Sequence, residues 1–140
     1  MQFQVGDIFH IYNRGNNQQK IFFNDDNYRF FLKKISKEIL PHCDILAYCM
    51  MRNHFHLLVH IKPAVKPNAL NYGIAILLRS YTRAIQNQEK ISGSLFQQKT
   101  KSKELRNEPA NSTMNQVAVC LHYIHQNPLR AGIVKIWKTG

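Results

Sequence analysis

The sequence predicts an α+β fold of the ferredoxin-like (RRM-like) kind: an antiparallel sheet with helices on one face and an additional C-terminal helix. The main observation is that strand-like apolar segments are interleaved with segments of helical periodicity, in the order strand, helix, strand, strand, helix, helix. In addition, 140 residues, 44% of them hydrophobic, suffice for one sizeable core. We therefore expect a single domain over residues 1–140, and a truncation at its C-terminus stays an open alternative.

The first strand and helix are predicted by a change of period. Residues 7–13 alternate, with Phe9 and Ile11 on one side and His10 and Tyr12 on the other, which is typical of a strand. A turn follows at residues 14–17. A helix is then expected after Asn24, a good N-cap followed by two aspartates, and Pro41 ends it. Its apolar stripe is Tyr28, Phe31, Leu32, Ile35 and Ile39.

The middle of the chain predicts a hairpin and a second helix. Two apolar runs, 43–51 and 54–61, are separated by Arg52 and Asn53, which favours two strands joined by a tight turn. Apolar residues from about 68 to 88 recur at helical spacing. The apolar stripe of this second expected helix consists of Leu70, Ile74, Leu77, Leu78, Tyr81 and Ile85.

The last third is less regular. Residues 89–112 are polar and lack a clear pattern. Ser112 or Thr113 is a plausible cap for a third helix, which Pro128 closes. Residues 133–136 favour a short final strand or a packed tail.

Charge is the first indication of function. The chain has 19 Lys and Arg against 8 Asp and Glu, a net charge of +11. So large an excess on one domain favours a polyanionic partner, although a merely soluble basic protein is the alternative. No apolar run approaches the ~20 residues of a membrane helix, and we see no signal peptide. Three cysteines without a CxxC motif, Cys43, Cys49 and Cys120, suit buried thiols, so we expect a cytoplasmic protein without membrane contact.

A histidine pair is the strongest local signal. In residues 53–61, the apolar Phe55, Leu57, Val59 and Ile61 form one strand face, and the histidines at 54, 56 and 60 lie on the other with Leu58. Histidines two apart on a strand lie ~7 Å apart, so His54 and His56 can converge on one metal ion. The alternative is a pair of solvent-facing strand histidines, which is our interpretation of His60.

A tyrosine and an amide on the third helix complete the hypothesis. Tyr123 and Asn127 are four residues apart and therefore share a helix face. The Asn127 oxygen would then be a third metal ligand, and the Tyr123 hydroxyl would attack phosphorus to form a phosphotyrosine. The alternative is a packing tyrosine followed by a C-cap. Tyr81 is the rival nucleophile, but it falls on the apolar stripe of its helix, which favours a place in the core.

Four segments in this order resemble one known family. They are HIYNRGNN (10–17), AYCMMRNHFHLL (47–58), SLFQQK (94–99) and YIHQNPLRAG (123–132). With these four segments taken together, the chain resembles the HUH single-tyrosine transposases of small bacterial insertion sequences, and among them most closely the REP-associated tyrosine transposases. Two features depart from the family pattern: Arg52 replaces the usual Pro, and the chain stops before the usual Asp-Trp and Ser residues.

The resemblance implies a function and a set of residues. His54, His56 and Asn127 would bind a divalent metal, magnesium or manganese, and Tyr123 would be the catalytic nucleophile. The substrate would be single-stranded DNA beside a hairpin, and both a homodimer and a monomer are left open. Phosphate contacts are expected from basic residues, namely Arg14, Arg79, Arg83, Lys99, Lys101, Lys103 and Arg130. For each lysine a solvated surface charge is the alternative.

Three hypotheses follow from these residues. The first is an active transposase that cleaves and rejoins DNA through a 5′-phosphotyrosine. The second is a catalytically inactive or domesticated protein that binds hairpin nucleic acid. The third is a metal phosphodiesterase that uses water, in which Tyr123 is incidental. Exposed aromatic rings such as Tyr12 or Phe96 would stack on bases in the first two.

Overall fold

The computed structural model describes residues 3–63, 68–104 and 134–135. The elements in chain order are β1 (Ile8–Arg14), the 3-10 helix η1 (Asn16–Gln18), α1 (Asp25–Glu38), β2 (Cys43–Met51), β3 (His54–Ile61), α2 (Ala69–Glu89), β4 (Lys101–Glu104) and β5 (Val134–Lys135). The predicted third helix lies outside the described residues. The expected plan of an α+β domain with two helices is confirmed.

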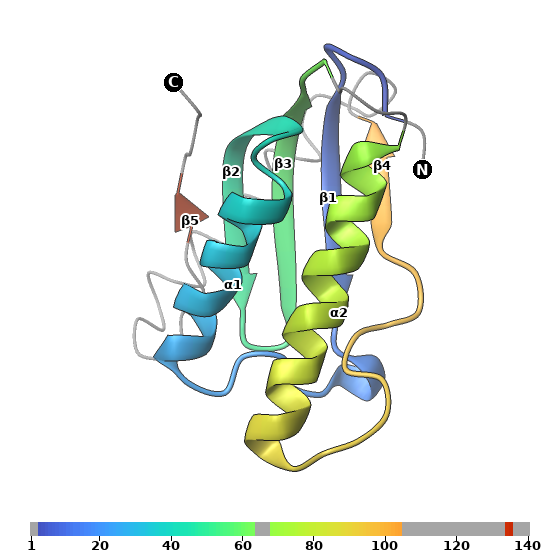
Figure 1. Cartoon of the computed structure of the whole chain (residues 1–140). Coiled ribbons are helices and arrows are strands. Elements are labelled where there is room, and N and C mark those ends of the chain that lie inside the picture. The colour runs from blue at the N-terminus through green and yellow to red at the C-terminus, as the bar shows by residue number, and fades with distance from the viewer. Residues whose placement is uncertain (1–2, 64–67, 105–133, 136–140) are drawn as a thin grey trace.

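One antiparallel sheet forms one layer and the two helices form the other (Figure 1). The strand order is β4-β1-β3-β2-β5, so the first four strands have the ferredoxin-like arrangement. Figure 1 shows α1 and α2 side by side on the same face of the sheet. The opposite face carries His54 and His56, and we call it the histidine face.

Local sequence explains where these elements begin and end. The Asn24 side chain accepts a hydrogen bond from the Asn27 backbone N–H at 3.0 Å, which confirms the predicted N-cap of α1. β2 and β3 have the predicted bounds, and Arg52 and Asn53 form the turn between them. Burial alternates along the whole of β3, as its alternation of side chains predicts.

The fourth strand corrects our expectation for residues 89–112. β4 has the sequence KSKE and no apolar side chain, yet it pairs with β1 over four residues. It lies at an edge of the sheet, where charged residues are tolerated because they discourage pairing with other chains. Lys101 and Lys103 lie on one face of β4, because side chains alternate along a strand. Lys99 precedes the strand, so this alternation does not decide where its side chain points.

The core lies between the helices and the sheet and is rich in aromatic rings. Tyr81 on α2 is fully buried and contacts the rings of Phe22, Phe31 and Phe96. Gly73 lets the two helices approach closely, because a Cβ there would overlap the backbone carbonyl of Glu38. Cys43 and Cys49 are buried, as predicted, and Cys120 lies outside the described residues.

A β-bulge in β2 decides which residues reach the histidine face. Ile45 pairs with Val59, but Ala47 pairs with Leu58, so Leu46 is the extra residue. Beyond the bulge, Cys49 and Met51 lie opposite His56 and His54 on the histidine face. Tyr48 and Met50 instead point to the helices. This change of face explains why the run 43–51 shows no alternation in sequence.

Candidate metal centre

His54 and His56 lie together, as predicted from their spacing on one strand. Their ring centroids are 5.1 Å apart and the ring planes are nearly perpendicular, at 81°. Both side chains are half-buried on the histidine face. They line a cavity of about 540 Å³ together with Tyr12, Arg14, Asn53, Asn13 and Gln18.

The Nδ1 atom of His54 is held by its neighbour in the turn. It lies 2.7 Å from the amide oxygen Oδ1 of Asn53. Because an amide oxygen can only accept, the Nδ1 of His54 carries the hydrogen. The lone pair is then on Nε2, which is the nitrogen free to bind a metal.

The Nδ1 atom of His56 is held from the neighbouring strand. It lies 2.8 Å from Nε2 of His10 on β1. Tyr12 is the direct partner of His56 in the strand register, and its ring stacks on both histidines, at centroid distances of 4.5 Å to His10 and 5.7 Å to His56. The orientation of the His56 ring is therefore restricted from two sides.

Burial keeps these imidazoles neutral at physiological pH. Desolvation is the main cause and lowers the pKa of His56 to about 3, with further lowering by His10, His54 and Arg14. Desolvation and the charge of Lys103 lower the pKa of His10 to about 4. Desolvation and Arg14 also lower the pKa of His54. A neutral imidazole is the form that binds a metal, so the pair is ready for this role.

The donor set of the described residues fits a divalent metal only in part. Two neutral imidazoles suit manganese or zinc, and they suit magnesium when oxygen ligands are added. Within residues 3–63 and 68–104 no group of three His, Cys, Asp or Glu side chains is placed to hold a metal. Any third protein ligand would therefore be of another side-chain type or come from residues outside these ranges. Asn127, the ligand expected from the sequence, lies outside the described residues, as do Tyr123 and Arg130.

Tyr81 is a core residue, as its position on the apolar stripe predicted. Its hydroxyl donates a hydrogen bond to the backbone oxygen of Ile21 at 2.6 Å, in a fully buried environment. Burial raises its pKa, so the phenol stays protonated. These contacts do not suit a nucleophile that must reach DNA.

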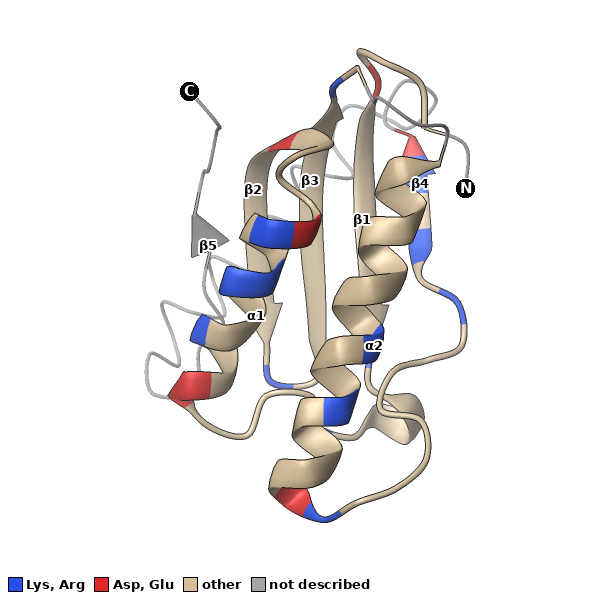
Figure 2. Ribbon diagram, viewed as in Figure 1, with Lys and Arg blue, Asp and Glu red and all other residues tan. Residues whose placement is uncertain are grey.

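The basic residues expected to contact DNA separate into two places. Arg14 lines the histidine cavity, and Lys101 and Lys103 lie on the histidine face, opposite Tyr12 and His10 in the register. Figure 2 shows basic positions on β4, on the loop that leads into it and on α2. Lys99 is exposed on that loop.

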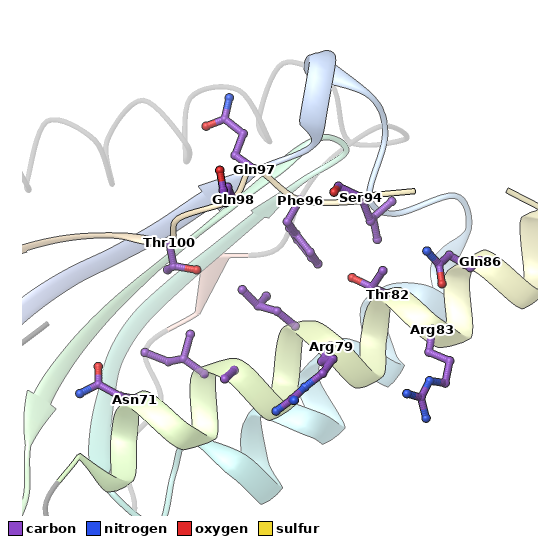
Figure 3. Close-up of a pocket in the computed structure, with 14 residues that line it drawn as sticks. Asn71, Arg79, Thr82, Arg83, Gln86, Ser94, Phe96, Gln97, Gln98 and Thr100 are labelled. Carbon is purple, nitrogen blue, oxygen red and sulfur yellow. The ribbon is translucent and has the colours of Figure 1, made fainter. Parts of the chain in front are cut away.

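Arg79 and Arg83 lie at a second cavity, on the helix layer. This cavity, of about 640 Å³, separates α2 from the segment 94–100 (Figure 3). Figure 3 shows the two arginine side chains extending from α2 away from that segment. Phe96 contributes to the wall but is only 7% exposed, so our expectation that it stacks on bases is wrong. Its ring packs against the core because Phe55 and Tyr81 lie beside it.

Three polar residues near the site were not singled out from the sequence. His10 and Asn53 hold the two histidines of β3. Asn13 donates hydrogen bonds to the backbone oxygen of Gln97 and the hydroxyl of Thr100, which fixes the segment 94–100 beside β1. The signal for His10 was its place on the polar side of an alternating strand, but nothing local pairs it with His56.

Comparison with known proteins agrees with this fold. The sequence model of the family described as "Transposase IS200 like" matches residues 6–127. A solved structure of a REP-associated tyrosine transposase bound to a REP hairpin has a similar fold, with a TM-score of 0.53. The identity is 15%, and the match covers 89% of this chain and 68% of that one. None of the curated proteins matches the sequence.

The fold and the family match thus define a domain of the kind used by IS200-like transposases. The chain belongs to the IS200-like transposase family. No helix within the described residues is long and apolar enough to cross a lipid bilayer.

Proposed function

We propose that this protein cleaves and rejoins single-stranded DNA beside a hairpin, with a divalent metal held by His54, His56 and Asn127 and with Tyr123 as nucleophile. The observation that carries the proposal is the pair of neutral imidazoles on one sheet face, in a cavity that also contains Arg14. Membership of the transposase family supplies the reaction class. The similar solved structure is bound to a REP hairpin, which favours the same kind of DNA here.

The reaction is a transesterification in two steps. The Tyr123 hydroxyl attacks the scissile phosphorus and forms a bond to the 5′ phosphate. The bond between the phosphorus and the 3′ oxygen breaks, and that oxygen leaves as a 3′ hydroxyl with the proton that Tyr123 loses. A second 3′ hydroxyl then attacks the phosphotyrosine and releases Tyr123. Each step forms one phosphoester bond and breaks one, so no nucleotide hydrolysis is needed.

The protein groups stabilise charge and position the DNA. A bound divalent ion would supply a Lewis acid for the scissile phosphate. Arg14 lines the same cavity and is suited to a non-bridging phosphate oxygen. Lys101 and Lys103 extend the positive surface along the same face, so they would contact the backbone next to the cleavage point. Arg79, Arg83 and Lys99 are proposed as contacts further away, and Arg130, which lies outside the described residues, is proposed as an additional contact.

A denaturing gel tests the nucleophile. The full chain is incubated with hairpin-containing single-stranded DNA and Mn²⁺, and a covalent protein–DNA band is expected. Tyr123→Phe should abolish the band, whereas the matched variant Tyr81→Phe should keep it, because Tyr81 is buried in the core.

Two other outcomes would support the competing hypotheses. Binding without any cleavage would indicate an inactive or domesticated hairpin-binding protein. Cleavage that survives Tyr123→Phe would indicate a phosphodiesterase that uses water, and it would refute our assignment of the nucleophile.

A further inference from the structure

His10 occupies a position on the histidine face where a polar side chain needs a partner. It is 3% exposed, and its strand neighbours are Leu58 on β3 and Lys103 on β4. Neither neighbour supplies an acceptor or a neutral donor. The ring instead reaches diagonally across to His56, where Nε2 and Nδ1 are 2.8 Å apart.

This contact fixes which nitrogen of His56 is available to a ligand. If His10 were the donor, the His56 hydrogen would lie on Nε2 and this atom could not bind a metal. If His56 donates from Nδ1, its Nε2 lone pair is free. His54 already has this second arrangement, because its Nδ1 faces the acceptor oxygen of Asn53.

We propose that His10 is a positioning residue, whose Nε2 accepts the hydrogen of His56 Nδ1 and so fixes His56 in the tautomer and orientation that bind the metal. The inference rests on the metal role proposed above for His54 and His56. Metal-binding histidines commonly donate their second ring N–H to an acceptor, which orients the ring. Here the acceptor is a second histidine from another strand, and Tyr12 stacks on both rings.

The first test measures Mn²⁺ binding to the full chain without DNA. His10→Phe keeps a flat ring beside Tyr12 but removes the acceptor, and we expect its affinity for Mn²⁺ to fall roughly 10- to 100-fold. His10→Gln places an amide oxygen near the position of Nε2 and should bind Mn²⁺ about as well as the wild type. His60→Gln is the matched control, because this histidine is on the same face of β3 but pairs with Asp44 instead. Titration calorimetry, or the decrease of the free-Mn²⁺ electron paramagnetic resonance signal, gives the affinity.

The second test needs no variant and therefore does not depend on folding of His10→Phe. Long-range ¹H–¹⁵N correlation spectra of the metal-free wild type report which ring nitrogen of each histidine carries the hydrogen. We expect the hydrogen of His56 on Nδ1 and none on Nε2. A hydrogen on Nε2 of His56, or unchanged Mn²⁺ affinity in a folded His10→Phe protein, would overturn the proposal.

These measurements separate this inference from the proposed function. If the wild-type protein forms no covalent band in the DNA assay but binds Mn²⁺ normally and shows the expected tautomer, the proposed reaction is refuted and the role of His10 is not. Normal cleavage by a His10→Phe protein with wild-type Mn²⁺ affinity would refute the role of His10 alone.

Discussion

Removal of one hydroxyl group from the core tests both the packing and the assignment of the nucleophile. Tyr81 on α2 donates a 2.6 Å hydrogen bond to the backbone oxygen of Ile21, in the segment between η1 and α1. The backbone N–H of Ile21 is itself bonded to the Arg52 carbonyl in the β2–β3 turn. The hydroxyl therefore connects α2 to the part of the chain that supports the hairpin of His54.

The expected cost follows from burial. Tyr81→Phe keeps the ring and its aromatic contacts but leaves the Ile21 oxygen without this donor in a dry environment. Loss of a buried partner typically destabilises by about 1–3 kcal/mol. For a domain of this size, a loss of ~2 kcal/mol lowers Tm by roughly 6–8 °C. Urea denaturation followed by circular dichroism measures the change in the free energy of unfolding.

The control and the refuting results come from the same helix. Tyr72 on α2 is 68% exposed, so Tyr72→Phe should change the free energy of unfolding by less than about 0.5 kcal/mol. If Tyr81→Phe is as stable as Tyr72→Phe, the buried hydrogen bond contributes nothing and the reasoning fails. If a folded Tyr81→Phe protein loses the covalent DNA band while Tyr123→Phe keeps it, Tyr81 rather than Tyr123 is the nucleophile.

Three further predictions concern pH, helix packing and charge. The folded-state pKa values of His10 and His56 lie below the ordinary value of 6.5, so the unfolded chain binds more protons than the folded protein below this pH. The free energy of unfolding, measured by urea denaturation in EDTA, should therefore be constant above pH 6.5 and fall toward pH 4, by up to about 1.4 kcal/mol per pH unit for each histidine. A flat profile over this range would contradict the prediction. Gly73→Ala places a methyl group against the carbonyl of the last residue of α1 and should destabilise the fold by about 1–3 kcal/mol, and an unchanged Tm would show that the helices separate freely. Lys101→Gln and Lys103→Gln should each weaken single-stranded DNA binding at low salt and reduce the salt slope of log K by about 0.7, without a change in Tm; equal slopes would place the DNA elsewhere.

Much of the fold was predictable because its signals are local. Caps, turns and periodicity act within a few residues, so α1, the β2–β3 hairpin and α2 appeared close to their observed bounds. The segregation of apolar residues and histidines along β3 likewise follows from alternation within one strand. For the same reason Tyr81 could be assigned to the core before its contacts were known.

The parts that sequence did not predict depend on pairing between distant segments. β4 carries no apolar pattern because it is an edge strand, and it becomes a strand only by hydrogen bonding to β1. Phe96 was expected at the surface, but its neighbours Phe55 and Tyr81 come from two other elements. No window around residue 96 contains that information.

The sequence by itself determined that two histidines of one strand share a face, because a strand alternates whatever its surroundings. Only the tertiary structure decided what surrounds that pair. The bulge at Leu46 turns Cys49 and Met51 toward the histidine face, and the register of β1 with β3 brings His10 to His56. Register is a property of two strands and the turn between them, so no single segment encodes which side chains will meet across it.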